Sequence, residues 1–284
     1  MKAGIVGRGE IGSVLGEMLA RGGAIVSYWD REAARSTVSS VAELGTVADV
    51  IFIATPSSAV GETAAALVPR KEPGVLITLA KGVEPGWKTM DTVLKEHAPG
   101  WAYGLLYGPM LAEELRMGKA GAAILALSDM HWHEPIARAL APQLRIEKTD
   151  DLKSIALCGA LKNCYAIALG ICDGLELGMN AKGALTACII GELEMILESL
   201  GADPRAAHGL AGLADIIATG GSEHSANHAV GLAAARGAEL PHGEGINTLR
   251  EAPHAIDLSR FPILSTTRAV LCDGAEPQRI KECL

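Results

Sequence analysis

The sequence has few aromatic residues and no excess of positive charge, and both absences narrow the class of protein. Aromatic residues make up 4% of the 284 residues while 33 are glycine, which favours close packing of helices and sheets over an aromatic stacking surface. Acidic residues outnumber basic residues 33 to 25, which argues against binding to nucleic acid or to an anionic membrane. Apolar residues reach 49%, too many for a disordered chain. We therefore expect a soluble enzyme.

No targeting segment, disulfide framework or metal site is expected either. The N-terminal run Met1–Gly7 is too short for the apolar core of a signal peptide. The six cysteines form no CxxC pair, and four of them lie in apolar helical sequence, which predicts small buried thiols. The expected location is the cytoplasm.

The longest apolar stretch, Ile155–Cys172, reaches the length of a membrane-spanning helix. Lys162 and Asn163 stand at its middle, where a charge in lipid is costly. This stretch therefore predicts a buried core helix with a functional lysine rather than a membrane span.

Short apolar runs alternate with amphipathic stretches in the first half of the chain. The predicted strands are Lys2–Val6, Ala24–Trp29, Val50–Ala54, Val75–Leu79, Ala122–Leu127 and Leu144–Glu147. The predicted helices between them are Gly12–Arg21, Ser57–Val68, Trp87–His97 and Pro135–Ala141. This alternation is typical of a Rossmann-type fold, a doubly wound parallel sheet with helices on both faces.

The second half of the chain is helical throughout. Its predicted helices are Asp151–Cys172, Ala181–Leu200, Leu213–Thr219, Ala226–Arg236 and Pro262–Leu271. The change of pattern predicts an α/β protein of two domains, a dinucleotide-binding domain over residues 1–148 and an all-helical substrate domain over residues 149–284.

A GxGxxG motif, Gly7–Gly12, directly follows the first predicted strand. Gly7 permits a tight turn, Gly9 lets the backbone approach a pyrophosphate, and Gly12 allows close packing of helix and strand. Asp30 follows the second strand, where a carboxylate binds the ribose 2′-hydroxyl and repels a 2′-phosphate. The predicted cofactor is NAD, with NADP as the alternative because Arg31 lies beside Asp30. A glycine-rich turn without ligand and a surface Asp30 are the structural alternatives.

Two lysines stand in apolar or glycine-rich sequence. Lys81 follows the strand Val75–Leu79 at its carboxyl end, where open α/β sheets bind ligands. Lys162 has Cys158, Gly159, Tyr165 and Ala166 as its helical neighbours. Apolar surroundings lower the pKa of a lysine toward the range of a general acid or base. The alternative is a lysine on a solvated helix face.

These stretches together resemble the NAD(P)-dependent glycerol-3-phosphate dehydrogenase family. The resemblance rests on Gly7–Gly12, Thr55–Ser57, Ala80–Gly82, Gly108-Pro109, Ala112–Glu114, Gly159–Asn163, Asp173–Lys182, Gly209–Thr219 and Gly243–Gly245, which occur in family order. It implies interconversion of sn-glycerol 3-phosphate and dihydroxyacetone phosphate, a small phosphorylated three-carbon substrate, by hydride transfer to or from NAD(P). It also implies a homodimer.

The resemblance assigns roles to individual residues. The catalytic set comprises Lys162 as general acid and base, Lys81 as a positive charge near the developing alkoxide, and Asp215 and Thr219 as orienting groups. The cofactor-binding set comprises Gly7, Gly9, Glu10, Ile11, Gly12, Asp30, Arg31, Pro56, Lys81, Ala112 and Glu244. The substrate-binding set comprises Lys81, Gly108, Asn163, Ser225 and Asn227, the last three at the phosphate end.

The chain departs from the family pattern at the phosphate end, so it resembles a divergent member. Ala226 stands where the family has an arginine that resembles a phosphate clamp. His224 and His228 flank this position, either as partial replacements or as ordinary surface histidines. Tyr107 replaces a small residue before Gly108, and Cys188 replaces another arginine. Two further hypotheses follow: a dehydrogenase for another small 2-hydroxy or 2-oxo substrate, and a catalytically idle NAD-binding regulatory protein.

Overall fold

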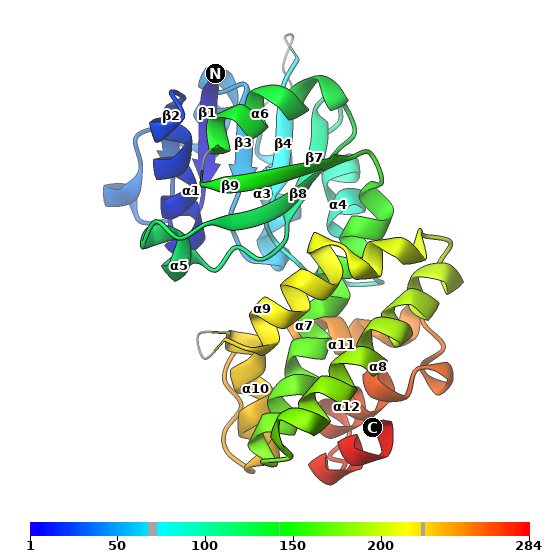
Figure 1. The fold of residues 1–284 in the computed structure, drawn as a ribbon. Coiled ribbons are helices and arrows are strands. Elements are labelled where there is room, and N and C mark those ends of the chain that lie inside the picture. The colour runs from blue at the N-terminus through cyan, green and yellow to red at the C-terminus, as the bar shows by residue number, and fades with distance from the viewer. Residues whose placement is uncertain (68–72, 142, 223–224) are drawn as a thin grey trace. The chain divides into compact units, whose positions relative to one another are not determined.

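A computed structural model describes residues 1–67, 73–141, 143–222 and 225–284. The chain forms two compact units (Figure 1). The first unit contains Met1–Ala80 and Met90–Leu152, and the second contains Lys81–Thr89 and Lys153–Leu284. The pattern of the sequence carries no sign that the short segment Lys81–Thr89 belongs with the helices of the second unit.

The first unit is built on a seven-stranded sheet of order β2-β1-β3-β4-β7-β8-β9. Its strands are β1 (Lys2–Val6), β2 (Ile25–Trp29), β3 (Val50–Ile53), β4 (Val75–Thr78), β7 (Ala102–Tyr107), β8 (Gly121–Leu127) and β9 (Leu144–Thr149). The first five strands in the sheet run parallel, with Val6 in register with both Trp29 and Ile53. The carboxyl ends of these strands therefore share one edge, and the predicted Rossmann-type class is confirmed.

Two features of the sheet differ from the prediction. Strand β7, the fifth of the seven in the sheet, was not predicted. Strand β8 pairs antiparallel to β7 and parallel to β9, so β8 and β9 run opposite to the other five strands. Gly104 in β7 explains why this strand has a weak sequence pattern: a Cβ there would lie 2.5 Å from the Ala126 carbonyl oxygen. Close approach of two backbones requires glycine at a position where a strand pattern favours a β-branched residue.

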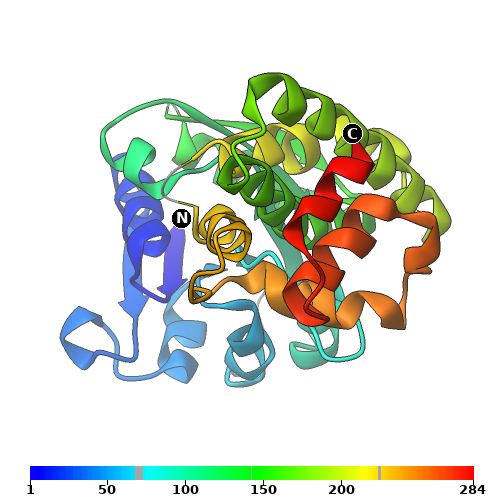
Figure 2. The same ribbon diagram turned by 90° about the horizontal axis from the view of Figure 1, so that it is seen from below.

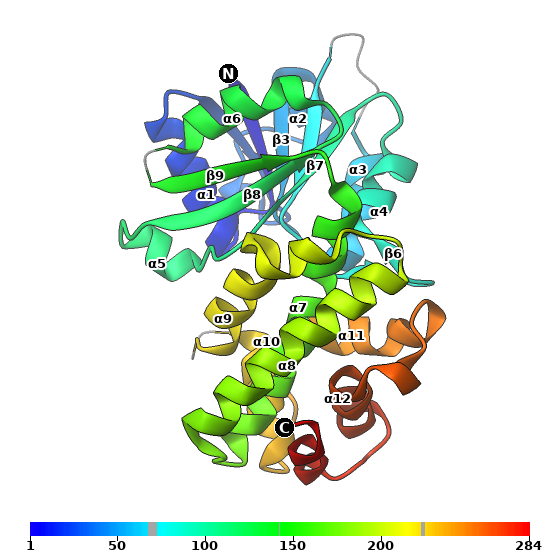
Figure 3. The same ribbon diagram turned by 45° about the vertical axis from the view of Figure 1, so that its right-hand side comes forward.

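Helices cover both faces of the sheet (Figure 3). One face carries α1 (Glu10–Arg21), α5 (Ala112–Arg116) and α6 (His133–Leu140), which share a core cluster with the strands. The other carries α2 (Val41–Val47), α3 (Val60–Ala65) and α4 (Met90–His97). The predicted helix Trp87–His97 was wrong at its start, because residues 88 and 89 form strand β6. Of the predicted helix Ser57–Val68, residues 57–59 form a 3₁₀ turn, and Val68 lies outside the described residues.

The second unit is helical apart from one small hairpin. Its helices are α7 (Leu152–Gly174), α8 (Gly178–Ser199), α9 (Asp215–Gly220), α10 (Ala226–Ala235), α11 (Glu244–Glu251) and α12 (Pro262–Cys272), with a C-terminal 3₁₀ segment packed beside α12 (Figure 2). The hairpin joins β5 (Val83–Glu84) to β6 (Lys88–Thr89). Its strand β5 packs against α11.

Helix α7 is the core of this unit. By length and composition it could cross a membrane, with a mean hydropathy of 1.7, but the whole of its apolar window is buried inside the protein. Helix α10 packs closely along it: a Cβ at Gly231 would lie 2.0 Å from the Ile167 carbonyl oxygen. An apolar helix enclosed by other helices needs apolar residues on all sides, which accounts for its membrane-like composition.

Candidate active site

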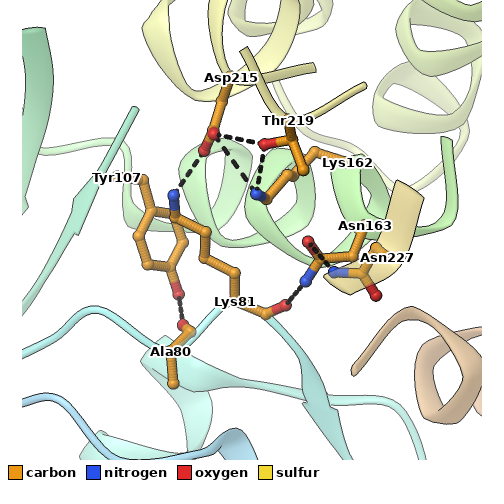
Figure 4. Close-up of polar contacts among 8 residues, drawn as sticks. All are labelled: Ala80, Lys81, Tyr107, Lys162, Asn163, Asp215, Thr219 and Asn227. Atoms are coloured by element: carbon orange, nitrogen blue, oxygen red, sulfur yellow. Dashed lines mark hydrogen bonds and ion pairs between the residues drawn. The ribbon is translucent and has the colours of Figure 1, made fainter. Parts of the chain in front are cut away.

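Two lysines, a carboxylate and a hydroxyl meet in the second unit (Figure 4). The Lys81 ammonium lies 2.6 Å from Asp215 Oδ2, and the Lys162 ammonium lies 3.4 Å from Asp215 Oδ1. Lys162 also donates to Thr219 Oγ1 at 2.8 Å, and the Thr219 hydroxyl donates to Asp215 Oδ1 at 3.1 Å. The structure thus brings together all four residues of the predicted catalytic set, which lie up to 138 positions apart in the chain.

The backbone around Asp215 explains how this carboxylate reaches the lysines. A wide helical turn of the π type, Leu210–Ala214, precedes α9, and Gly212 within it has the non-helical angles φ −96° and ψ −105°. A Cβ at Gly212 would lie 2.2 Å from the Ala207 carbonyl oxygen, so only glycine fits. Asp215 and Thr219 then occupy positions i and i+4 of α9, on one face of the helix.

Burial sets the electrostatics of this cluster. Lys162 is 7% exposed and Asp215 is 3% exposed. Burial, reinforced by the positive charge of Lys81, lowers the pKa of Lys162 to about 8, although Asp215 opposes the change. Burial also disfavours ionised Asp215, but the two lysines outweigh it and lower the pKa of that carboxyl. Because Lys81 is the nearer partner, Asp215 stays ionised while Lys162 is free to gain and lose a proton near neutral pH.

A chain of amides lies beside the lysines (Figure 4). Gly245 N–H donates to Asn227 Oδ1 at 2.9 Å, and Asn227 Nδ2 donates to Asn163 Oδ1 at 3.0 Å. Asn163 Nδ2 in turn donates to the Lys81 carbonyl oxygen at 2.7 Å. These bonds fix the orientation of both side-chain amides, and each amide nitrogen carries a second N–H. The Ser225 hydroxyl accepts from His228 N–H and caps α10.

His228 does not replace the arginine that the family pattern has at position 226, because the His228 imidazole binds another residue. The His228 imidazole lies 2.7 Å from Asp173 Oδ2, and Lys182 lies 2.6 Å from the same oxygen. Burial opposes ionisation of Asp173, but these two partners lower the pKa of its carboxyl. His228 therefore links α10 to α7, while Ala226 itself is exposed. His224 lies outside the described residues.

Two glycines of the predicted motif, Gly7 and Gly9, line a cavity in the first unit. The cavity has a volume of about 700 Å³ and is lined by Gly7, Gly9, Trp29, Asp30, Arg31, Glu32, Ser39, Ser40, Val41, Ala42, Ala54, Thr55, Pro56, Ala59, Glu62, Thr63 and Ala66. Gly7 has a φ of +90°, and a Cβ at Gly12 would lie 2.0 Å from the Gly7 carbonyl oxygen. A Cβ at Gly9 would meet nothing within 4 Å, so this backbone stays open to a ligand.

The polar groups of this cavity suit a nucleotide. Asp30 accepts the Arg8 N–H at 2.6 Å and the Glu32 N–H at 2.9 Å. Burial opposes ionisation of Asp30, but these bonds and the nearby guanidinium groups lower the pKa of its carboxyl. Thr55 Oγ1 is buried without a hydrogen-bond partner among the described residues. The charged Asp30 oxygens keep acceptor capacity for ribose hydroxyls, so the residues present fit a dinucleotide.

The remaining residues of the predicted cofactor and substrate sets belong neither to the lysine cluster nor to the lining of the nucleotide cavity. In the first unit, Glu10 begins α1, Ile11 packs against the core cluster, and Ala112 begins α5. Gly108, with a φ of +136°, follows β7. Glu244 begins α11 in the second unit, and its charge acts to raise the pKa of Lys162. In the described part of the chain, no group of three His, Cys, Asp or Glu side chains could hold a metal ion.

Tyr107 and Thr55 were both named from the sequence, but neither of them was assigned a role in the site. The Tyr107 hydroxyl donates to the Ala80 carbonyl oxygen, one peptide unit before Lys81 (Figure 4). Thr55 follows β3 at the edge of the sheet that lines the cavity. Its place after a strand was the available signal, because ligands bind at the carboxyl ends of parallel strands.

Comparison with protein-family models and with known proteins shows which family this chain is similar to. Residues 151–282 and 36–133 match the family models described as the C-terminus and N-terminus of NAD-dependent glycerol-3-phosphate dehydrogenase. The chain is 30% identical to glycerol-3-phosphate dehydrogenase (NAD(P)+) of Pseudomonas syringae pv. syringae, covering 99% of this chain and 92% of that protein. For the same enzyme of Streptomyces coelicolor the identity is 31%, covering 98% and 94%.

The fold is similar to solved structures at lower identity. A glycerol-3-phosphate dehydrogenase from Coxiella burnetii aligns with a TM-score of 0.89 at 24% identity, covering 99% of this chain and 97% of that chain. A ketopantoate reductase from Ralstonia eutropha aligns with a TM-score of 0.60 at 18% identity, covering 99% of each chain. At these identities the likeness concerns the fold alone.

Proposed function

Because the chain belongs to the NAD(P)-dependent glycerol-3-phosphate dehydrogenase family, we propose that it interconverts sn-glycerol 3-phosphate and dihydroxyacetone phosphate. It is an NAD(P)-dependent dehydrogenase that acts on a secondary alcohol. The observation that carries the proposal is the buried Lys162, which bonds Thr219 at 2.8 Å and has a pKa of about 8. A general acid and base for an alcohol–ketone pair needs a pKa in this range.

Lys162 supplies the proton chemistry. During reduction its ammonium gives a proton to the C2 oxygen of the substrate, and during oxidation the neutral amine takes that proton back. Thr219 accepts one Lys162 N–H and so orients the amine. The fixed bond geometry means that little reorganisation is needed when the proton moves.

Lys81 and Asp215 provide fixed charge beside this proton transfer. Their contact of 2.6 Å holds the Lys81 ammonium in place, where its positive charge stabilises a developing alkoxide. Asp215 remains ionised through its two lysine partners. Removal of either charge therefore changes both the geometry and the protonation of Lys162.

The asparagine pair supports binding of the phosphate end. Among the described residues, each side-chain amide nitrogen donates one N–H, and its second N–H remains available to a ligand. Two neutral donors bind a phosphate more weakly than a bidentate arginine does. The exposed Ala226 therefore favours, as a second candidate, a dehydrogenase for another small 2-hydroxy or 2-oxo substrate.

Bound in the cavity of the first unit, NAD(P) supplies a nicotinamide that accepts or donates the hydride. Gly7 and Gly9 would hold its pyrophosphate against the N-terminus of α1. Asp30 would bind the ribose hydroxyls and disfavour a 2′-phosphate, so NAD is the preferred form.

Steady-state kinetics with a substrate panel tests the proposed function. Dihydroxyacetone phosphate, its unphosphorylated analogue and other small 2-oxo compounds are compared with NADH as the reductant. A kcat/KM that is highest for the phosphorylated ketone supports the main proposal. No gain from the phosphate would favour the second candidate, and no oxidation of NADH by any compound would favour an idle NAD-binding protein.

A cytoplasmic homodimer also stays a proposal. All six cysteines are free thiols, as suits a reducing compartment. Cell fractionation checks the location. Light scattering on the purified chain checks the dimer, and a monomer mass at micromolar concentration would contradict it.

A further inference from the structure

The β5–β6 hairpin carries Lys81 at its base, and three polar contacts between described residues join it to helices of the second unit. Two attachments belong to the catalytic cluster: the ion pair of Lys81 with Asp215, and the bond from Asn163 to the Lys81 carbonyl oxygen. The third lies at the tip of the hairpin, where Gly86 N–H donates to Glu251 Oε2 at 2.8 Å. This third contact involves no residue of the predicted catalytic set.

The hairpin cannot hold its own shape. Each of its strands has two residues, and so short a pair is not stable alone in water. Its turn places Gly86 at φ 79° and Trp87 at φ 62°, and the left-handed region is costly for a residue with a bulky side chain. The turn therefore depends on contacts from outside the hairpin.

Helix α11 supplies those contacts and also supports the asparagine pair. At its N-terminal end, Gly245 N–H donates to Asn227. At its C-terminal end, Glu251 accepts the Gly86 N–H, and strand β5 also packs against the helix. One short helix thus braces the amide chain and the hairpin that carries Lys81.

We propose that Glu251 is a positioning residue for Lys81: its carboxylate holds the tip of the β5–β6 hairpin and thereby keeps the Lys81 ammonium on Asp215. A displacement of about 1 Å in such a group lowers a catalysed rate up to about a hundredfold. The inference deepens the proposed function and rests on it.

A second contact of the same oxygen offers a matched control. His254 Nδ1 lies 3.3 Å from Glu251 Oε2 and its side chain is 61% exposed. Replacing His254 with alanine removes this neighbour but leaves the Gly86 bond. Glu251→Gln keeps an oxygen that accepts the Gly86 N–H, whereas Glu251→Ala removes it.

Kinetics of the three variants test the proposal. We expect Glu251→Ala to lower kcat for dihydroxyacetone phosphate about tenfold, because a Lys81 ammonium that is no longer held on Asp215 stabilises the developing alkoxide less. The midpoint of its pH profile should move to higher pH, because a loosened Lys81 no longer lowers the pKa of Lys162. Glu251→Gln should restore both properties, and His254→Ala should match the parent.

Hydrogen exchange gives a readout that does not depend on activity. The Gly86 amide should exchange faster in Glu251→Ala than in the parent, and at the parent rate in His254→Ala. Unchanged exchange, or lost activity with an unshifted pH profile, would overturn the role of Glu251. An inactive parent protein would instead refute the proposed function, and the exchange rates would still decide whether Glu251 holds the hairpin.

Discussion

The Lys81 ammonium and the Asp215 carboxylate lie 2.6 Å apart although the two residues are 134 positions apart in the chain. This pair occupies the carboxylate and leaves Lys162 with a longer contact of 3.4 Å to the same group. Lys162 therefore receives less stabilisation of its charged form than an isolated Lys–Asp pair would give. The pKa of Lys162 is about 8 because burial and the nearby positive charge of Lys81 lower it, while the single carboxylate of Asp215, which also binds Lys81, opposes this only in part.

Replacing Lys162 with alanine removes the proposed general acid and base. We expect kcat to fall by about a hundredfold to ten-thousandfold, with the fold and NAD binding retained because the nucleotide cavity belongs to the other unit. Steady-state kinetics, circular dichroism and NADH titration check these outcomes. Lys153→Ala, which changes a lysine in the first turn of the same helix, is the matched control, and near-normal turnover of Lys162→Ala would contradict the mechanism.

The pH dependence should take opposite signs in the two directions. Reduction needs charged Lys162, so its kcat/KM should fall as the pH rises through about 8, whereas oxidation should rise over the same interval. Lys81→Met removes a positive charge that lowers the pKa of Lys162, so both midpoints should move to higher pH. Profiles in both directions check this, and a midpoint that moves to lower pH would show that another group titrates.

Restoring an arginine at position 226 should strengthen binding of the phosphate. A charge-assisted hydrogen bond contributes about 1.5–3 kcal/mol, so Ala226→Arg should lower the KM for dihydroxyacetone phosphate at least tenfold. The KM for unphosphorylated dihydroxyacetone serves as the internal control and should not change. Equal effects on the two ketones would show that residue 226 does not face the phosphate.

Replacing Asp30 should reduce the preference for NAD over NADP. Asp30→Ser removes the negative charge that opposes a 2′-phosphate, while the nearby Arg31 and Arg35 remain. We expect the ratio of kcat/KM for NADH over NADPH to fall about tenfold or more. Kinetics with each cofactor check this ratio, and a parent enzyme that already prefers NADPH would contradict the assignment.

The buried carboxylate of Glu192 should matter for stability. It accepts the Ile263 and Leu264 N–H groups at 2.8 Å each and the Tyr165 hydroxyl at 3.1 Å, and so caps α12 from α8. Glu192→Ala leaves these buried donors without an acceptor and should lower the free energy of unfolding by about 2–4 kcal/mol. Urea denaturation measures the change. Tyr165→Phe removes one donor only and should cost about 1 kcal/mol, and equal losses would contradict this account.

Much of the site could be predicted because its residues break local patterns. A charged residue in the apolar run around Lys162 has a high cost unless it has partners, and three glycines in Gly7–Gly12 directly after a strand indicate a turn whose backbone approaches a ligand. Both signals are local, so the sequence alone was enough to identify them. The alternation of strands and helices likewise predicted the Rossmann-type class.

Other features depend on contacts between distant segments. Strand β7 was missed because its Gly104 is required by the nearby Ala126 backbone, and the start of α4 was misplaced because residues 88 and 89 pair in a hairpin. The partner of His228 is Asp173, 55 positions earlier, and no spacing rule connects them.

The sequence by itself determined which groups are available for chemistry: a lysine within an apolar helix, a glycine-rich turn after a strand, and an alanine in place of an arginine. Only the tertiary structure decided which of the charged groups lie within contact distance of one another. Asp215 reaches both lysines because the turn around Gly212 and the packing of α9 bring its carboxylate there. Protonation of Lys162 depends on burial and on distances to other charges, and these quantities exist only after the chain has folded.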